Sequence, residues 1–190
     1  MDVISAQQTF FYVLVSVSGL ALCFGIGASG VASVIGPSVG GGALSVRQAV
    51  ALAAVMEFAG AYLAGGEVSD TIAHGIIDSR HFAAAPQLLI VVMLASLLAA
   101  GSWLLLASAR AWPVAATHAL VGALCGAAIA AFGADAINGL TIVEIGFAWL
   151  LAPLGGGLLA LLLTMSCRRL IFNTAHPVAA ARQWVPLYAF

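Results

Sequence analysis

The sequence contains no lysine and few charges of either sign. All six of its basic residues are arginine, and charged residues make up 7% of the 190 residues, compared with roughly 25% in a typical soluble domain. So few charged side chains cannot cover the core of a soluble protein of this size, whereas lipid accepts an apolar surface. The net charge of −1 gives no indication of nucleic-acid binding, and we expect no such partner.

Cysteine and the motifs of soluble enzymes are also scarce. The three cysteines, Cys23, Cys125 and Cys167, lie far apart in or beside apolar runs. This placement favours small buried residues over a disulfide or a metal site. The sequence shows no phosphate-cradling loop with its lysine and no nucleophile elbow. We therefore expect neither an enzyme nor a resident cofactor.

Apolar residues are what the chain has in abundance. Hydrophobic residues make up 63% of it, and the mean hydropathy is +1.13. A helix needs about 20 apolar residues to cross a bilayer, and five runs approach that length: residues 10 to 25, 46–64, 88–108, 114–132 and 142–165. The first eight residues carry no basic residue, so the first run is expected to be a retained helix rather than a signal peptide. The sequence predicts an all-α, polytopic membrane protein with about five transmembrane helices.

The arginines predict the orientation of these helices. With the N-terminus outside, only Arg80 falls on the outer side. The inner side then holds Arg47, Arg110, Arg168, Arg169 and Arg182. Because positive charge favours the cytoplasm, we predict a multi-pass protein of the inner (plasma) membrane with an external N-terminus and a cytoplasmic C-terminus.

Two stretches fit poorly as continuous helices. Residues 25–42 contain seven glycines and Pro37 without any charge, and in a helix interior Gly costs about 1 kcal/mol and Pro about 3 kcal/mol relative to Ala. Residues 112–118, WPVAATH, place Pro113 where it would suit the first turn of a helix. Both favour broken or re-entrant helices, whose free N–H groups can hold an anion, as in secondary transporters. The alternative is close helix packing, which we expect of Gly122 and Gly126.

Two residues inside the predicted spans, Glu57 and His118, are candidate titratable groups of a transport path. Glu57 lies near the middle of the second span, where a charge costs a few kcal/mol and indicates a function. It is either part of a proton or cation path or a neutral side chain bonded to a backbone carbonyl. His118 is either a proton carrier or a simple polar contact. The polar residues after the second span favour a solvated outer loop over a metal site; they are Glu67, Asp70, His74, Asp78 and His81.

Three segments resemble conserved stretches of one transporter family. GASGVASVIGPSVGGGALSVRQ at residues 27–48 resembles the first signature of the inorganic phosphate transporter family. EFAGAYLAGGEVSDTI at residues 57–72 resembles its second conserved stretch, and PVAATHALVGALCG at residues 113–126 resembles its third. The resemblance implies a secondary transporter built of inverted repeats, with a broken helix at the anion site. It also implies symport of phosphate or sulfate with H⁺ or Na⁺.

The resemblance assigns roles to individual residues. Those that it places at the anion are Ser29, Gly30, Val31, Ser33 and Thr117. Those that it assigns to coupling or support of transport are Glu57 and His118.

The chain departs from the family signatures at several of these positions. The first signature usually reads G-A-N-D-x-A-N, and here Ser29, Gly30 and Ser33 stand at its Asn, Asp and Asn positions. The third usually reads P-V-S-T-T-H, and here Ala115 and Ala116 replace two hydroxyl residues. The G-A-S-G form resembles the sulfate permease branch of the family. Sulfate has no proton to donate at neutral pH, so a site of N–H and hydroxyl donors without a carboxylate would suit it.

The resemblance covers one half of such a transporter. Residues 1–172 correspond to the first transmembrane repeat, and residues 173–190 to a cytoplasmic linker and the beginning of a truncated next helix. We therefore expect a second transporter half, or a homodimer partner, beside this chain in the lipid bilayer. The alternative is a non-transporting, degenerate membrane scaffold that supports a partner subunit.

Overall fold

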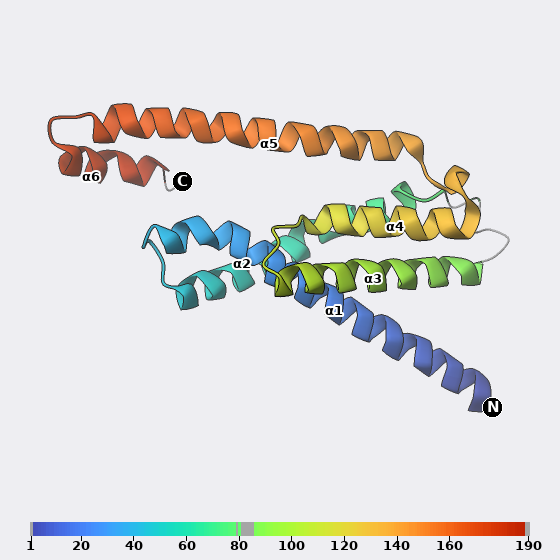
Figure 1. Ribbon diagram of the computed structural model, residues 1–190. Helices are drawn as coiled ribbons and strands as arrows, with labels where there is room; N and C mark the ends of the chain where they lie inside the picture. The colour runs from blue at the N-terminus through green and yellow to red at the C-terminus, as the bar shows by residue number, and fades with distance from the viewer. Residues whose placement is uncertain (1, 79, 81–85, 189–190) are drawn as a thin grey trace. The chain divides into compact units, whose positions relative to one another are not determined.

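The computed structural model describes residues 2–78, 80 and 86–188, and these residues are helical apart from short connections (Figure 1). The α-helices are α1 (Asp2–Gly40), α2 (Val46–Asp70), α3 (Pro86–Ala109), α4 (Ala116–Phe132), α5 (Gly139–Cys167) and α6 (Pro177–Tyr188). Short π and 3-10 turns adjoin them, namely η1 (Thr71–Gly75), η3 (Ala134–Ala136) and η4 (Arg168–Phe172). By contacts the chain divides into two compact units, Met1–Thr141 and Ile142–Phe190.

Four helical segments are long and apolar enough to cross a membrane. They are Gln8–Gly40, Val46–Gly66, Pro86–Ala109 and Gly139–Phe172. They confirm four of the predicted spans and an all-α membrane fold. The remaining predicted span is the shorter α4, whose 17 residues extend only roughly 25 Å at 1.5 Å per residue. It begins at Ala116 rather than at residue 114, so the expectation that Pro113 occupies a first helical turn is wrong.

The predicted break within residues 25–42 is confined to the last two residues of this stretch. Helix α1 runs without interruption to Gly40, with Pro37 inside its last turn. An apolar environment leaves backbone N–H and C=O groups no partner except one another, so the helix persists despite its glycines. The chain reverses only afterwards, at residues 41–45, where Gly42 has a φ of +72°.

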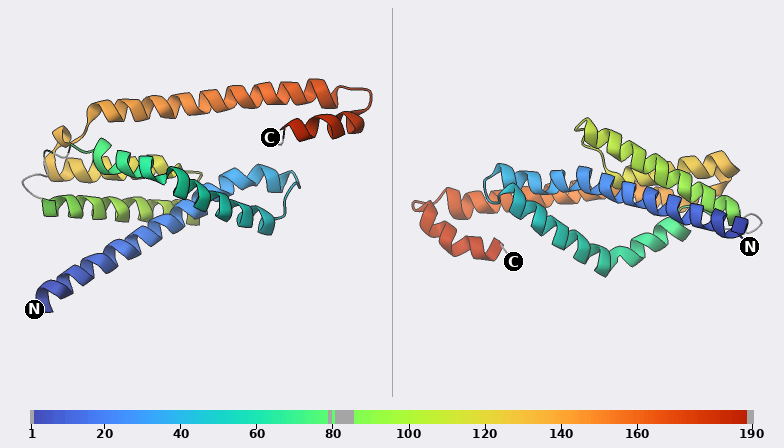
Figure 2. Two further views of the ribbon diagram at one scale, coloured as in Figure 1. Left: turned by 180° about the vertical axis from the view of Figure 1, so that it is seen from behind. Right: turned by 90° about the horizontal axis from the view of Figure 1, so that it is seen from below.

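The beginning of α2 is set by a capping box. The Ser45 N–H donates to Gln48 Oε1 at 3.0 Å, and the Gln48 N–H donates to Ser45 Oγ at 3.4 Å. This reciprocal pair satisfies two N–H groups that a helix end otherwise leaves free. Helix α2 therefore begins at Val46, as predicted, and returns beside the last part of α1 (Figure 2).

The core of the first unit lies where α1 crosses α3 and α4. Leu22, Ala100 and Leu104 are its buried centre. A Cβ at Gly25 would lie 3.0 Å from the Leu104 Cβ, and one at Gly101 would lie 3.5 Å from the Leu22 backbone. Glycine is therefore needed on both helices for this close approach. The α4 side chains packed on this centre are Ala116, Ala119, Leu120 and Ala123.

The expected glycine packing on α4 does not occur among the described residues. A Cβ at Gly122 or Gly126 would meet no heavy atom within 4 Å in the described part of the chain. Helix α4 instead contacts α3 through the alanine and leucine side chains of the core. The Ser96 hydroxyl of α3 lies 2.7 Å from the Val92 carbonyl and 3.4 Å from the Ala123 carbonyl of α4.

The segment predicted as a solvated outer loop is largely helical and partly buried. Helix α2 continues to Asp70 and η1 to Gly75, after which Ile76 and Ile77 are buried. The Asp78 N–H donates to the Ala136 carbonyl and the Asn138 N–H to the Ile76 carbonyl, both at 2.9 Å. This short bridge joins the segment after α2 to the segment after α4. His81 lies outside the described residues.

The second unit is a helical hairpin. The end of α5 continues through η4, and α6 folds back beside it (Figure 1). Ser166 Oγ and Tyr188 Oη are hydrogen-bonded at 2.5 Å across 22 residues of sequence. Apart from Ile171, the residues of α5, η4 and α6 are not buried within this chain.

Candidate functional site

Helices α1 and α2 enclose a groove of about 380 Å³ between them. From α1 it is lined by Gly27, Ala28, Val31, Ala32 and Ile35, and from α2 by Val50, Ala53, Ala54 and Glu57. The α2 residues follow i, i+3, i+4, i+7 spacing and therefore share one helix face. Glu57 is the one ionisable residue of the lining, and its side chain is exposed within this chain. The groove is thus lined mainly by small apolar side chains, with one carboxylate in its wall.

Ser29 and Ser33 lie on a different face of α1. With about 100° of rotation per residue, they continue the stripe of Ser18, Leu22 and Gly25, which is buried toward α3. Val31, on the groove, lies on the opposite side of the helix. The structure therefore brings Val31 together with Glu57 and places the two serines away from them.

The serine hydroxyls bond back to their own helix. Ser29 Oγ donates to the Gly25 carbonyl at 2.9 Å, and Ser33 Oγ lies 3.4 Å from the Ser29 carbonyl. Such i−4 bonds are common for serine inside helices. The N–H groups of Gly30 and Val31 lie in the interior of α1, where the helix itself engages them. A broken helix would leave these N–H groups free to bind an anion. In this structure they are instead hydrogen-bonded within α1.

Thr117 and His118 begin α4. Ala115 precedes the helix with φ −83° and ψ 123°, and no side chain caps the end. The Thr117 side chain is exposed in this first turn. His118 lines a hollow of about 400 Å³ together with Trp103, Val114, Ala115 and Ala119. An uncapped first turn leaves N–H groups available to an anion.

Two tryptophan side chains and an arginine pack together where α3 leads into its connection to α4. The Arg110 guanidinium lies 5.2 Å from the Trp112 ring centre, and the Trp112 and Trp103 rings are 6.1 Å apart. Ala111 adopts a φ of +53° to make this turn. Stacked cation and aromatic groups are stabilised by the negative face of the ring.

The three sequence segments meet around α1. The second segment contributes Glu57 to the groove on one side of α1. The third segment packs Ala116 and Ala119 against the centre formed by Leu22 and Leu104. The first segment lies in the same helix as Leu22, a few residues further along. Among the described residues, no three His, Cys, Asp or Glu side chains lie together as a metal site would require.

Comparison with known proteins decides the family. Residues 26–190 match the profile of the phosphate transporter family. The chain belongs to this family. It is a multi-pass membrane protein with the helices described above, in keeping with that membership.

Individual proteins of the phosphate transporter family are also similar to this chain. A Haemophilus influenzae protein whose name contains the words phosphate permease is 38% identical over 188 residues, which are 99% of this chain and 45% of the relative. The Arabidopsis thaliana inorganic phosphate transporter 2-1, chloroplastic, is 38% identical over 90% of this chain and 29% of its own length. A solved structure titled the sodium-dependent phosphate transporter matches with a TM-score of 0.84 and 32% identity, over 90% of this chain and 42% of that one.

The chain spans less than half the length of these family relatives. Their names refer to phosphate, and the expected likeness to a sulfate permease branch finds no support among them. The small groove residues Ala28, Ala53 and Ala54 were not among the residues predicted from the sequence. The sequence did contain a pattern that predicts this groove, since small side chains at i, i+3 and i+4 spacing allow two helices to approach each other closely.

Proposed function

We propose that this chain forms the first membrane-embedded half of a secondary-active phosphate transporter. The observation that carries the proposal is the family match over residues 26–190, which contains all three segments around α1. The groove between α1 and α2 is the part of this half that we assign to the transport path. In this proposal residues 1–172 form the repeat and residues 173–190 the linker to a second half or to a second copy.

Glu57 is the proposed coupling residue. A carboxylate at membrane depth is costly unless a cation or a proton neutralises it. Phosphate is itself an anion, so moving it through an apolar environment also requires compensating positive charge. Binding of H⁺ or Na⁺ beside Glu57 would neutralise the carboxylate, and each charge of the phosphate would need a further cation. His118, at the first turn of α4, is the second proposed support residue.

The proposed anion donors come from two helices. The exposed Thr117 hydroxyl adjoins the uncapped N–H groups of α4. Ser29 and Ser33 can exchange a neutral bond to a carbonyl for a bond to the anion, and charge-assisted hydrogen bonds are about twice as strong as neutral ones. Gly30 and Val31 would contribute N–H groups only if α1 opened locally during transport.

Uptake measurements test the proposed site. The chain, expressed with the complementary half of a family relative in cells that lack their own phosphate uptake, is assayed with labelled phosphate and labelled sulfate. We expect phosphate uptake that Ser29→Ala lowers and Ser18→Ala does not. Ser18 is the matched control because its hydroxyl also bonds back, to the Leu14 carbonyl at 2.7 Å, outside the family segments. Normal uptake by Ser29→Ala would remove the serine from the site.

The same assay separates phosphate transport from its alternatives. Preferential uptake of labelled sulfate would show that sulfate, and not phosphate, is the transported anion. No uptake of either anion, with the chain present and folded in the membrane, would favour the scaffold half. Imposing a sodium gradient or a proton gradient separately identifies the coupling ion.

A further inference from the structure

The C-terminal hairpin carries basic residues without any acidic ones. Residues 145–190 contain three arginines and His176 but no Asp or Glu. Arg168, Arg169 and Arg182 are all exposed. No carboxylate side chain of this segment can therefore neutralise them. By contrast, Arg80 in the first unit is held by Asp78, with Nε 2.9 Å from Oδ2.

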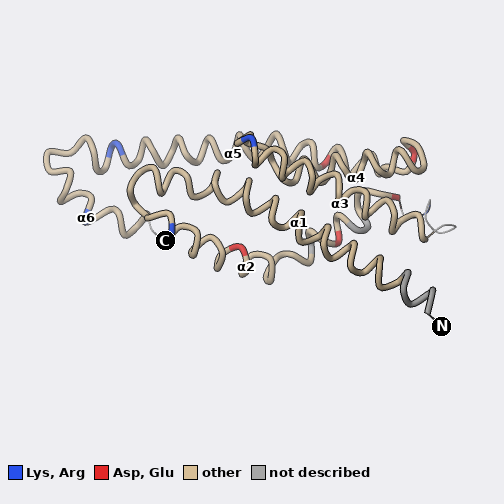
Figure 3. Tube along the Cα trace, turned by 60° about the horizontal axis from the view of Figure 1, so that its bottom comes forward, with Lys and Arg blue, Asp and Glu red and all other residues tan. Residues whose placement is uncertain are grey.

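The fold of the hairpin gathers the three arginines near the turn that joins η4 to α6. Ala181, Val185 and Tyr188 share one face of α6 and line an apolar hollow of about 430 Å³ with Cys167, Ile171 and their neighbours. Since Ser166 pairs with Tyr188, Arg168 and Arg169 lie about half a turn to one turn, and Arg182 nearly two turns, from this pair toward the turn that joins the two helices. Figure 3 shows basic residues at this end of α5 and on α6. We call Arg168, Arg169 and Arg182 the arginine belt.

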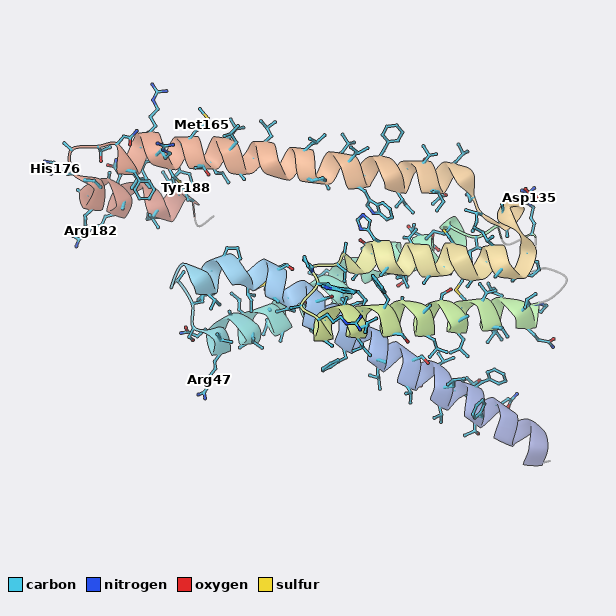
Figure 4. All side chains as sticks on the ribbon, viewed as in Figure 1. Arg47, Asp135, Met165, His176, Arg182 and Tyr188 are labelled. Atoms are coloured by element: carbon cyan, nitrogen blue, oxygen red, sulfur yellow. The ribbon has the colours of Figure 1, made fainter. Side chains whose placement is uncertain are left out.

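The side chains of the hairpin end point outward. In Figure 4, Arg182 and His176 project away from α5, whereas Tyr188 lies between α6 and α5. The Ser166–Tyr188 hydrogen bond and the apolar hollow hold this arrangement. The belt is therefore presented by a folded element and not by a free tail.

The length of α5 sets the depth of the belt in a membrane. The 23 residues between Glu144 and Arg168 carry no charge and extend roughly 35 Å as a helix. The hydrocarbon core of a bilayer is about 30 Å thick. Arg168 and Arg169 therefore lie where the hydrocarbon ends and the lipid phosphates begin. Trp184 and Tyr188 on α6 are side chains that prefer the same interface.

We propose that the arginine belt binds the headgroups of anionic phospholipids. The guanidinium group forms paired hydrogen bonds with phosphate oxygens. A zwitterionic headgroup supplies a phosphate together with a compensating cation, so an anionic headgroup such as phosphatidylglycerol is favoured. Bound lipid would hold the α5–α6 hairpin at the membrane surface.

Native mass spectrometry of the protein released from mixed bilayers tests the proposal. The full chain is taken from bilayers of phosphatidylcholine and phosphatidylglycerol, and the bound lipids are counted. We expect retained phosphatidylglycerol. Arg182→Gln should weaken it on the order of fivefold, and each further substitution in the belt by a similar factor. Arg80→Gln changes the net charge equally but should leave lipid retention unchanged.

Two further arms distinguish lipid binding from binding of a free anion and from a folding defect. Free inorganic phosphate at millimolar concentration should not displace the lipid, and displacement would show that the belt is an anion vestibule instead. Circular dichroism of each variant should match the wild type, because the exposed arginines contribute no core packing. Equal retention of phosphatidylcholine and phosphatidylglycerol, or equal losses in Arg182→Gln and Arg80→Gln, would overturn the proposal.

Discussion

Glu57 places a single carboxylate in the otherwise apolar groove between α1 and α2. Its neighbours in the groove are Ala, Val, Gly and Ile side chains, which offer an ion no polar partner. The carboxylate is therefore the natural place for a cation to bind on this surface. In a membrane such a group is retained only where it is neutralised or paired.

Replacing Glu57 by Gln should abolish coupled uptake while preserving the fold. Gln has almost the same volume and can still form hydrogen bonds, but it cannot bind a proton or a cation by charge. We expect at least a tenfold loss of phosphate uptake, which corresponds to about 1.4 kcal/mol. Glu144→Gln, on the exposed first turns of α5, is the matched control. Equal uptake by both variants would remove Glu57 from the mechanism.

The glycines of α1 should respond differently to the same substitution. A Cβ at Gly25 would lie 3.0 Å from the Leu104 Cβ, whereas one at Gly19 would meet nothing within 4 Å. Gly19→Ala should change the free energy of unfolding by less than about 1 kcal/mol, because helix propensity favours alanine less where no water competes for the backbone. Gly25→Ala should lower it by about 1–3 kcal/mol, because the α1–α3 contact must open. Thermal unfolding in detergent measures both, and equal shifts would contradict the close approach.

At the scale of elements, the beginning of α2 depends on a local pattern. Ser45 and Gln48 form the capping box that stops the glycine-rich turn and starts the helix. The segment that resembles the first family signature, residues 27–48, contains Ser45 and ends at Gln48. The turn and the helix start therefore depend on side-chain bonds that a sequence motif predicts well.

Loss of this cap should loosen the first turn of α2. Ser45→Ala removes the hydroxyl that accepts from the Gln48 N–H, at a cost of about 1 kcal/mol. Amide hydrogen exchange in the first turn of α2 should accelerate by about fivefold, the factor that corresponds to this energy. Ser69→Ala, on the exposed surface near the end of the same helix, should leave these amides unchanged. Unaltered exchange in Ser45→Ala would show that the turn alone holds the helix start.

For the whole molecule, the first unit has two distinct ends. Arg47 lies at the α1–α2 turn and Asp135 at the connection after α4, at opposite ends of this unit (Figure 4). The bias of arginine toward the cytoplasm places the Arg47 end inside. This orientation remains a prediction from charge.

Labelling from each side of the membrane tests the orientation. In a chain whose native cysteines are replaced by alanine, Arg47→Cys should react with an impermeant maleimide only from the cytoplasmic side. Asp135→Cys should react only from outside. Reaction of both from one side would contradict the packing of the first unit, and a reversed pattern would contradict the charge rule alone.

The helical nature of the membrane spans and the approximate limits of α3 and α5 follow from the sequence, because burial in lipid requires long apolar runs, whereas α1 extends well beyond the predicted residues 10–25. Residue 46 was predicted correctly as the first residue of α2, and the ends of α3 were correct to within two residues. The family resemblance also followed from short segments. The break in α1 did not, because propensity measured in water overstates the cost of glycine where no water competes for the backbone.

The chain of 190 residues by itself determined a membrane protein of the phosphate transporter family, through composition and three short segments. Only the tertiary structure decided which of the predicted site residues lie together. Val31 and Glu57 share a groove, while Ser29 and Ser33 lie on the opposite side of α1. The reason is physical: in a continuous helix each residue turns by about 100°, so residues adjacent in a motif point in different directions.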